Sequence, residues 1–189
     1  VSCKNGEPQF SRLVVRNNSS TEGGGLYFYN YANGNLYSTE ISSNNAHKGG
    51  GVFCSENSNT IFQDVYLHHN TAVVGGGGVA SYQNSQIEIY NSKFEANICQ
   101  SDHYGYGHGG GGLLSDRSNP RIDNTLFLKN YSVGHGGAMK NFPQSSPTIT
   151  NSIFIENHAG IIGGAVSISN SGIPLVRNNK FIGNVSPLG

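Results

Sequence analysis

The sequence predicts an all-β fold, a right-handed single-stranded parallel β-helix (solenoid) of about seven coils with roughly 27 residues each. Three observations predict it. The chain repeats itself at a nearly fixed spacing, each repeat contains short β-branched or aromatic runs, and Gly, Asn and Pro separate those runs. Self-similarity at a period of about 20–50 residues is typical of repeat architectures. We treat residues 1–189 as one β-helix domain and as a segment of a longer repeat protein.

The repeat is clearest in the C-terminal half, where segments 120–130, 147–157 and 174–184 share the form P-x-I-x-N-x-x-F-x-x-N with small variations. The same register extends toward the N-terminus as an apolar column: Val15, Ile41, Leu67, Phe94, Phe127, Phe154 and Phe181. Successive members are 26, 26, 27, 33, 27 and 27 residues apart. Five residues before each member stands another apolar residue: Phe10, Leu36, Phe62, Ile89, Ile122, Ile149 and Val176.

An asparagine follows each member of the apolar column by three residues: Asn18, Asn44, Asn70, Asn97, Asn130, Asn157 and Asn184. Coils of a parallel solenoid lie about 4.8 Å apart, so equivalent positions stack directly. Stacked carboxamides bond to one another as a ladder. We therefore predict a structural asparagine ladder, and we expect these residues also to accept the left-handed backbone of a sharp corner.

Paired glycines precede a second short strand in six of the repeats. We expect them to supply a bend where a Cβ atom would clash. The segments that follow begin at Leu26, Val52, Val79, Leu113, Ala138 and Ala165, which we expect to occupy equivalent positions. An α-helical repeat would need apolar residues at three- and four-residue spacing and few glycines, so helices are disfavoured.

The composition excludes several classes of function. Lys and Arg total 11, as do Asp and Glu, so the chain lacks the basic surface expected of a nucleic-acid-binding protein. No apolar run reaches the roughly 18 residues of a transmembrane helix. Cys3, Cys54 and Cys99 form no C-x-x-C pair; one disulfide with a free thiol and three reduced thiols both remain open. We expect no cofactor and no metal.

The Phe-x-x-Asn motif, at Phe94, Phe127, Phe154 and Phe181, alternates with Gly-Gly-Ala at 136–138 and 163–165. This pattern resembles the passenger repeats of polymorphic outer-membrane proteins, which are autotransporter adhesins. It is also similar to the wider pectin-lyase-like superfamily of right-handed β-helices. The resemblance covers nearly the whole chain and implies the fold. Its functional implication is broad, because related coils occur in adhesins, fibres, lyases and hydrolases.

One coil is six residues longer than its neighbours, which predicts a loop insertion at 98–108. Such insertions project from one side of a solenoid, often at a binding face. A sugar or a protein partner would suit the side chains that the loop carries: Asp102, His103, Tyr104, Tyr106 and His108. A polar loop without a task is the alternative. A metal held by Asp102, His108 and His135 is conceivable, but solvated turn histidines are the preferred interpretation.

Asp116 and Arg117, with Lys140 on the next coil, are weak candidates for catalysis. A hydrolase would need two carboxylates that face each other across the scissile bond, and Asp116 has no such partner in the pattern. A rim ion pair of small energetic value is the simpler interpretation.

These observations favour a non-enzymatic, extracellular or cell-surface protein that serves as an adhesin, a stalk or a self-assembling fibre subunit. Its partners would be host or cell-surface glycans or proteins, and its ends would be able to associate with each other, because uncapped coils leave strand edges unpaired. The alternative is a polysaccharide lyase or hydrolase, or a carbohydrate-binding β-helix. A depolymerisation screen separates these two hypotheses.

Overall fold

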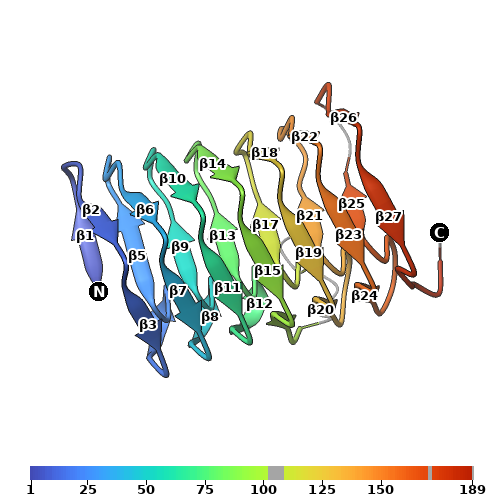
Figure 1. Cartoon of the computed structure of the whole chain (residues 1–189), viewed down its shortest axis with the longest axis horizontal. Helices are drawn as coiled ribbons and strands as arrows, with labels where there is room; N and C mark the ends of the chain where they lie inside the picture. Colours follow the sequence, from blue (N-terminus) through green and yellow to red (C-terminus); the bar gives the residue numbers. More distant parts are fainter. Residues whose placement is uncertain (102–108, 170–171, 189) are drawn as a thin grey trace.

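The computed structural model describes residues 1–101, 109–169 and 172–188, and these form a parallel β-solenoid whose coils follow one another along a single axis (Figure 1). The chain makes about six turns, close to the predicted seven coils. All strand pairs are parallel, and each strand pairs with its equivalents one coil before and after. The predicted fold class is therefore confirmed.

The strands form four sheets, named A to D in the order in which a coil visits them. Sheet A contains β1 (Ser2–Lys4), β5 (Leu26–Tyr29), β9 (Val52–Cys54), β13 (Val79–Ser81), β17 (Leu113–Ser115), β21 (Met139–Asn141) and β25 (Val166–Ile168). Sheet B contains β2 (Gln9–Ser11), β6 (Asn35–Tyr37), β10 (Thr60–Gln63), β14 (Ile87–Tyr90), β18 (Arg121–Asp123), β22 (Thr148–Thr150) and β26 (Leu175–Arg177).

Sheet C contains β3 (Val14–Arg16), β7 (Glu40–Ser42), β11 (Tyr66–His68), β15 (Lys93–Glu95), β19 (Leu126–Leu128), β23 (Ile153–Ile155) and β27 (Lys180–Ile182). Sheet D contains β4 (Ser19–Glu22), β8 (Asn45–Lys48), β12 (Thr71–Gly75), β16 (Ile98–Cys99), β20 (Tyr131–Ser132) and β24 (His158–Ala159). The strands are short because a corner interrupts the chain after every few residues.

Both predicted apolar columns are continuous stacks. On sheet C, Phe94 pairs with Phe127 and Phe127 with Phe154. Their ring centroids lie 4.8 Å apart at both steps, which is the spacing between the coils themselves. Phe127 and Phe154 are tilted by only 2° relative to each other. The column through Phe10 and Val176 lies on sheet B, and its members also stack in register.

The corners correct one expectation about the asparagines. The left-handed residue at the corner between sheets C and D is not the ladder asparagine but the residue before it, as at Ala96 (φ 49°) and Glu156 (φ 50°). The left-handed backbone that favours asparagine lies at the other corner, between sheets B and C, at Asn124, Asn151 and Asn178. The two asparagines of the repeated motif therefore have different tasks, one in the backbone and one in the ladder.

The glycines correct a second expectation, the register of the last coils. Met139, and not Ala138, pairs with Leu113, and Val166 pairs with Met139. Ala138 and Ala165 instead continue the column of Gly112. The residue two positions before this column is a left-handed glycine, Gly110 in one coil and Gly136 in the next. Each coil thus has a left-handed glycine, a second glycine, and a third position that is either Gly or Ala.

The backbone explains this choice of residues. A Cβ atom on Gly111 would lie 2.5 Å from the carbonyl oxygens of Gly137 and Tyr131, so the neighbouring coil itself forbids a side chain. A Cβ atom on Gly112 would lie 2.8 Å from the oxygen of Ala138. Later coils make room for alanine in that same column.

We predict that Gly111→Ala and Gly112→Ala differ sharply in their cost. Gly111→Ala should lower the free energy of unfolding by about 3 kcal/mol or more, because rigid backbone must move. Gly112→Ala should cost less than about 1.5 kcal/mol, because the alanines of the same column show that the site adapts. Urea denaturation of both variants tests this pair, and equal costs would contradict it.

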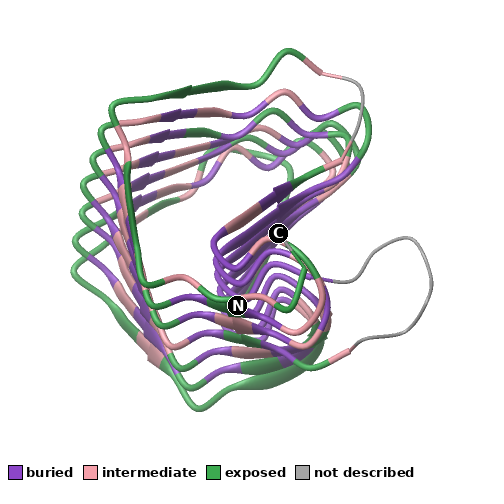
Figure 2. Ribbon diagram, turned by 90° about the vertical axis from the view of Figure 1, so that its right-hand side faces the viewer, coloured by how far each residue is buried: buried purple, intermediate pink, exposed green. Residues whose placement is uncertain are grey.

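Viewed along the axis, successive coils nearly overlie one another (Figure 2). The interior holds one continuous core to which sheets A, B and C contribute. Sheet A is buried on both faces: Leu113 and Met139 face the main core, whereas Phe53, Ala80 and Leu114 belong to a second cluster on the opposite face. This explains why two adjacent columns of these strands are apolar, since strands buried on both faces do not alternate.

Candidate functional site

The predicted asparagine ladder runs through every coil, from Asn18 to Asn184. The Nδ2 atom of each member donates to the Oδ1 atom of the next, over 2.8–3.0 Å. The same Oδ1 atom also accepts the backbone N–H of the preceding member, as between Asn97 and Asn130 at 3.1 Å. The second Nδ2 hydrogen goes to a backbone carbonyl, for example from Asn130 to Phe94 at 3.0 Å.

Every carboxamide inside the rod is therefore fully used. Asn70, Asn97, Asn130 and Asn157 are completely buried, and burial of such groups is tolerated only when their hydrogen bonds are made. The ladder is a structural device, as predicted, and it holds the corner between sheets C and D.

Further hydrogen-bonded rows of this kind were not predicted from the sequence. At the corner between sheets A and B, backbone N–H groups donate to buried serine hydroxyls of the next coil, as from Ser58 to Ser85 at 3.0 Å. A parallel row on the surface uses exposed amides, as from the Gln86 N–H to Asn59 Oδ1 at 3.1 Å. Serine and asparagine are so frequent in this chain that these columns do not stand out, although their spacing of about 27 residues would have revealed them.

The three weak catalytic candidates lie on neighbouring coils but do not form one cluster. Arg117 Nε lies 3.6 Å from Asp116 Oδ1, at the surface. Lys140 is only 5% exposed, and its ammonium donates to Ser167 and Ser169 and lies over the ring of Phe142. Burial lowers the pKa of Lys140. On the coil that carries Lys140, the residue in register with Asp116 is Phe142, and not Asn141 as the expected register implied.

The predicted ligand-binding side chains Asp102, His103, Tyr104, Tyr106 and His108 lie outside the described residues. The insertion leaves sheet D after β16 and returns to sheet A at β17. His135, the described member of the conceivable metal group, pairs its backbone with Gly109. Burial and then Lys140 lower the pKa of His135.

The cysteines are all unpaired. Cys3 and Cys54 occupy the same column, but Phe28 stands between them. They are thus two coils apart, about 9–10 Å, which exceeds the Cα separation that a disulfide spans. The sequence left open either one disulfide with a free thiol or three thiols, and the structure has three thiols.

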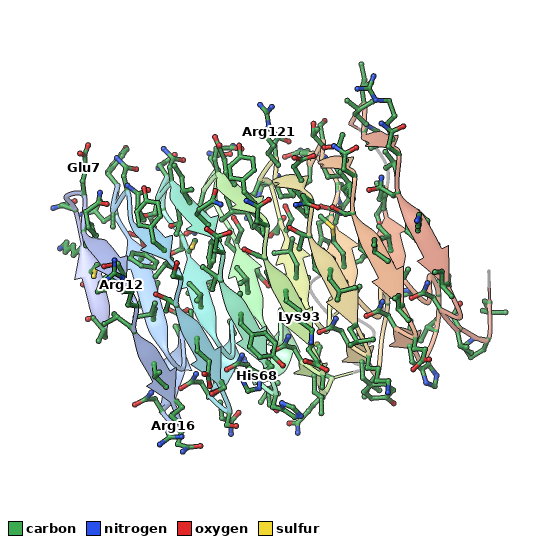
Figure 3. The ribbon with its side chains drawn as sticks, in the orientation of Figure 1. Glu7, Arg12, Arg16, His68, Lys93 and Arg121 are labelled. Carbon is green, nitrogen blue, oxygen red and sulfur yellow. The ribbon has the colours of Figure 1, made fainter. Side chains whose placement is uncertain are left out.

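The outer face of sheet C carries a polar network that the sequence did not predict. We call it the sheet C cluster; Figure 3 labels two of its members, His68 and Lys93. It comprises Glu40, Ser42, Tyr66, His68, His69, Lys93 and Glu95.

The sheet C cluster has two halves. Lys93 Nζ lies 2.7 Å from Glu95 Oε2, and the Tyr66 hydroxyl donates to the same carboxylate. The rings of Tyr66 and His68 stack at 4.2 Å. In the other half, His68 Nε2 lies 3.3 Å from Glu40 Oε1, and its Nδ1 lies 2.9 Å from His69 Nδ1.

Register explains why this cluster escaped sequence analysis. Glu40, Tyr66 and Lys93 are 26 and 27 residues apart, yet the parallel pairing stacks them on one face. Because these three residues differ in type, no single residue type recurs along this column. In the sequence, the sheet C cluster was visible only as polar residues at the positions on either side of the apolar column.

Comparison with known families fits this architecture. Residues 75–187, more than half of the chain, match the family described as "right handed beta helix region". The chain belongs to this family. A search of curated proteins found no significant match, and a search of solved structures found none either.

In this β-helix the ionisation of the sheet C cluster follows from its contacts. Burial raises the pKa of Tyr66 to about 12, and the hydrogen bond to Glu95 adds to the effect. Lys93 and then Tyr66 lower the pKa of Glu95. Near neutral pH the carboxylate is therefore ionised, and a protonated phenol and an ammonium both donate to it.

Within the described residues, the β-helix contains no helix that is long and apolar enough to span a membrane.

One buried side chain breaks the regular pattern of the β-helix. Asn141 is 0% exposed, and neither its Nδ2 nor its Oδ1 has a hydrogen-bond partner among the described residues. In the two preceding coils its register equivalents are serines: Ser81 donates to the carbonyl of Ser85 and Ser115 to that of Ser118, both at 2.8 Å. A serine in this column thus makes its hydrogen bond to a nearby backbone carbonyl, whereas the amide of Asn141 makes none.

We predict that Asn141→Ser raises the free energy of unfolding by about 1–2 kcal/mol, because it removes two unsatisfied buried atoms. The reciprocal change, Ser115→Asn, should lower it by a similar amount. Denaturant titrations of both variants measure the effect. A destabilised Asn141→Ser variant would show that the space left by the smaller side chain outweighs the polar gain.

Proposed function

We propose that this chain is a non-enzymatic, extracellular β-helical rod that acts as an adhesin, stalk or fibre subunit, of the kind found in autotransporter passenger domains of the pectin-lyase-like superfamily. The observation that carries the proposal is the asparagine ladder, which reaches both terminal coils without a break. A rod built this way extends by adding coils, and nothing in the ladder limits its length.

The two terminal coils support this proposal because their free groups are complementary. Among the described residues, the Asn184 backbone N–H has no acceptor, and Asn18 Oδ1 accepts no hydrogen bond. Inside the rod these are the two groups that meet between neighbouring coils, as at Asn157 and Asn184. A second copy stacked head to tail would therefore continue the ladder in register.

The apolar columns also continue to the last coil. Phe181 is 48% exposed and Val176 45% exposed, and both line an open cavity of about 560 Å³ at that end. The other terminal coil presents Phe10 and Val15, which pack on the core from one side only. Covering these columns with a further coil removes apolar area from water at about 25 cal/mol per Å².

Self-association is tested by light scattering and negative-stain microscopy of the chain over a wide concentration range. We expect head-to-tail rods, which Phe181→Glu abolishes because it places a charge in the stacked column. Val73→Glu is the matched control: Val73 is 40% exposed but lies mid-chain on β12. A monomer at every concentration, or equal loss in both variants, would contradict stacking.

Adhesion is tested separately by probing arrays of host glycans and surface proteins with the fluorescent chain.

The lyase or hydrolase hypothesis receives less support, since Lys140 is buried and its ammonium is bonded to serines. A screen of acidic and neutral polysaccharides decides between them. Depolymerisation that Asp116→Ala abolishes would replace the adhesin proposal with an enzyme.

A further inference from the structure

An open cavity of about 460 Å³ lies where the corner between sheets A and B meets the outer face of sheet B. Four consecutive coils line it, so it extends along the axis of the rod, and all of its lining residues except Ile61 have polar side chains. Figure 3 labels Glu7, on the first of these coils, and Arg121, which follows Glu88 in register on the coil beyond the cavity.

One wall of the cavity is a row of carboxamides whose oxygens are already used. Asn33, Asn59 and Gln86 occupy equivalent positions on consecutive coils. Asn33 Oδ1 accepts the Asn59 N–H over 3.2 Å, and Asn59 Oδ1 accepts the Gln86 N–H over 3.1 Å. Gln86 Oε1 accepts the Asn119 N–H over 3.2 Å. We call these three residues the amide row.

The bonds of the amide row fix which end of each carboxamide is free. A backbone N–H can be met only by an amide oxygen, so the –NH₂ group is the end that points away. Among the described residues, none of the three –NH₂ groups donates a hydrogen bond. The wall therefore presents three oriented donors, one in each coil and about 4.8 Å apart.

The outer face of sheet B supplies acceptors and an apolar surface. Ile61 and Glu88 pair in register, two residues after Asn59 and Gln86, and both are partly exposed. The Tyr90 hydroxyl donates to Glu88 Oε2 over 2.5 Å and holds the carboxylate in place. Donors, a fixed carboxylate and an aliphatic side chain thus line the same cavity.

This combination selects a neutral sugar. A sugar hydroxyl both donates and accepts, so neighbouring hydroxyls of one ring can be met by a carboxylate and an amide –NH₂ group together. The C–H face of the ring would cover Ile61. Glu7 and Glu88 disfavour an anion, and none of the described lining residues is Lys, Arg or His. An apolar ligand would strip water from the amide row without replacing its hydrogen bonds.

The spacing of the carboxylates indicates binding and not hydrolysis. Glu7 and Glu88 stand three coils apart, about 14 Å at strand spacing. The two carboxylates of a glycoside hydrolase lie no more than about 9.5 Å apart. The coil spacing itself is close to the length of one pyranose unit in an extended, β-1,4-linked chain.

We propose that this cavity binds a linear neutral oligosaccharide that lies along the axis of the rod, with about one sugar over each coil. The amide row donates to its hydroxyls, Glu88 accepts from them, and Ile61 packs against a ring face. This inference rests on the proposed adhesin function and names the glycan class that the adhesin holds.

Isothermal titration calorimetry with linear neutral hexasaccharides of β-1,4-glucose, β-1,4-xylose, β-1,4-mannose and β-1,4-N-acetylglucosamine tests the proposal. We expect at least one to bind with Kd below about 1 mM. The hexamer of α-1,4-galacturonate, which is anionic, should bind at least tenfold more weakly than that ligand. No binding of any neutral hexasaccharide below 1 mM would overturn the site.

The amide row is tested by Asn59→Asp and Gln86→Glu, which keep the oxygen that accepts the backbone N–H and remove only the –NH₂ donor. Each should weaken binding at least tenfold. Asn119→Asp is the matched control: Asn119 Oδ1 accepts the Ser146 N–H in the same way, but Asn119 does not line the cavity. It should change Kd less than twofold. Circular dichroism checks that each variant is folded, and equal effects at Asn59 and Asn119 would contradict the proposal.

Phe181→Glu separates this site from the proposed rod. Phe181 is on the last coil, far from the four coils of the cavity, so the variant should still bind the oligosaccharide although it no longer stacks. Stacking without glycan binding would refute this inference alone. Glycan binding by a chain that never stacks would leave the cavity in place and remove the fibre.

Discussion

Asn130→Ala should lower the free energy of unfolding by about 3–5 kcal/mol, one of the two strongest effects that we expect. The side chain takes part in four hydrogen bonds: it accepts two from Asn97 and donates to Phe94 and Asn157. Its removal loses about 1 kcal/mol for each bond. It also leaves the buried donors of Asn97 without an acceptor, which adds a desolvation cost.

The matched control for this prediction is Asn18→Ala, at the exposed terminal rung of the same ladder. It should cost less than about 1 kcal/mol, because water replaces the lost partners there. Urea denaturation at equal protein concentration measures both variants. Equal costs at Asn130 and Asn18 would mean that the ladder contributes nothing beyond an ordinary surface amide, and the account of the corner would fail.

Phe127→Ala is the second strong expectation, with a loss of about 3–5 kcal/mol. Phe127 is fully buried between Phe94 and Phe154, with a ring at 4.8 Å on each side. Deleting the ring leaves a cavity that the neighbouring coils cannot close, because their backbones are fixed at strand spacing. Each coil contacts only its neighbours, so the damage should also weaken the coupling between the two halves of the rod.

Phe181→Ala is the control for the phenyl stack, because Phe181 has a ring on one side only and is 48% exposed. We expect a loss of no more than about half that of Phe127→Ala. Thermal and denaturant unfolding measure the difference. Phe127→Leu, which keeps most of the volume, should recover much of the stability. A Phe127→Ala variant as stable as the unchanged chain would contradict a stack that depends on packing.

The candidate site was only partly predictable. The ladder asparagines could be found because one residue type repeats in every coil at the same offset. The sheet C cluster could not, because Glu40, Tyr66, His68 and Lys93 differ in type and come together only through register. For the same reason Asp116 and Lys140 looked like partners in the sequence, whereas burial and serine hydroxyls account for Lys140.

By itself, the sequence determined the fold, the period, both apolar columns and the asparagine ladder. A solenoid has the same physical requirement once in every coil, so the same residue type recurs at a fixed spacing in the sequence. Only the tertiary structure decided which residue at a corner is left-handed, where Ala138 stands in its column, and which polar side chains meet on the outer faces. Those outcomes depend on the position of neighbouring backbone to within an ångström, and a pattern of residue types carries no such information.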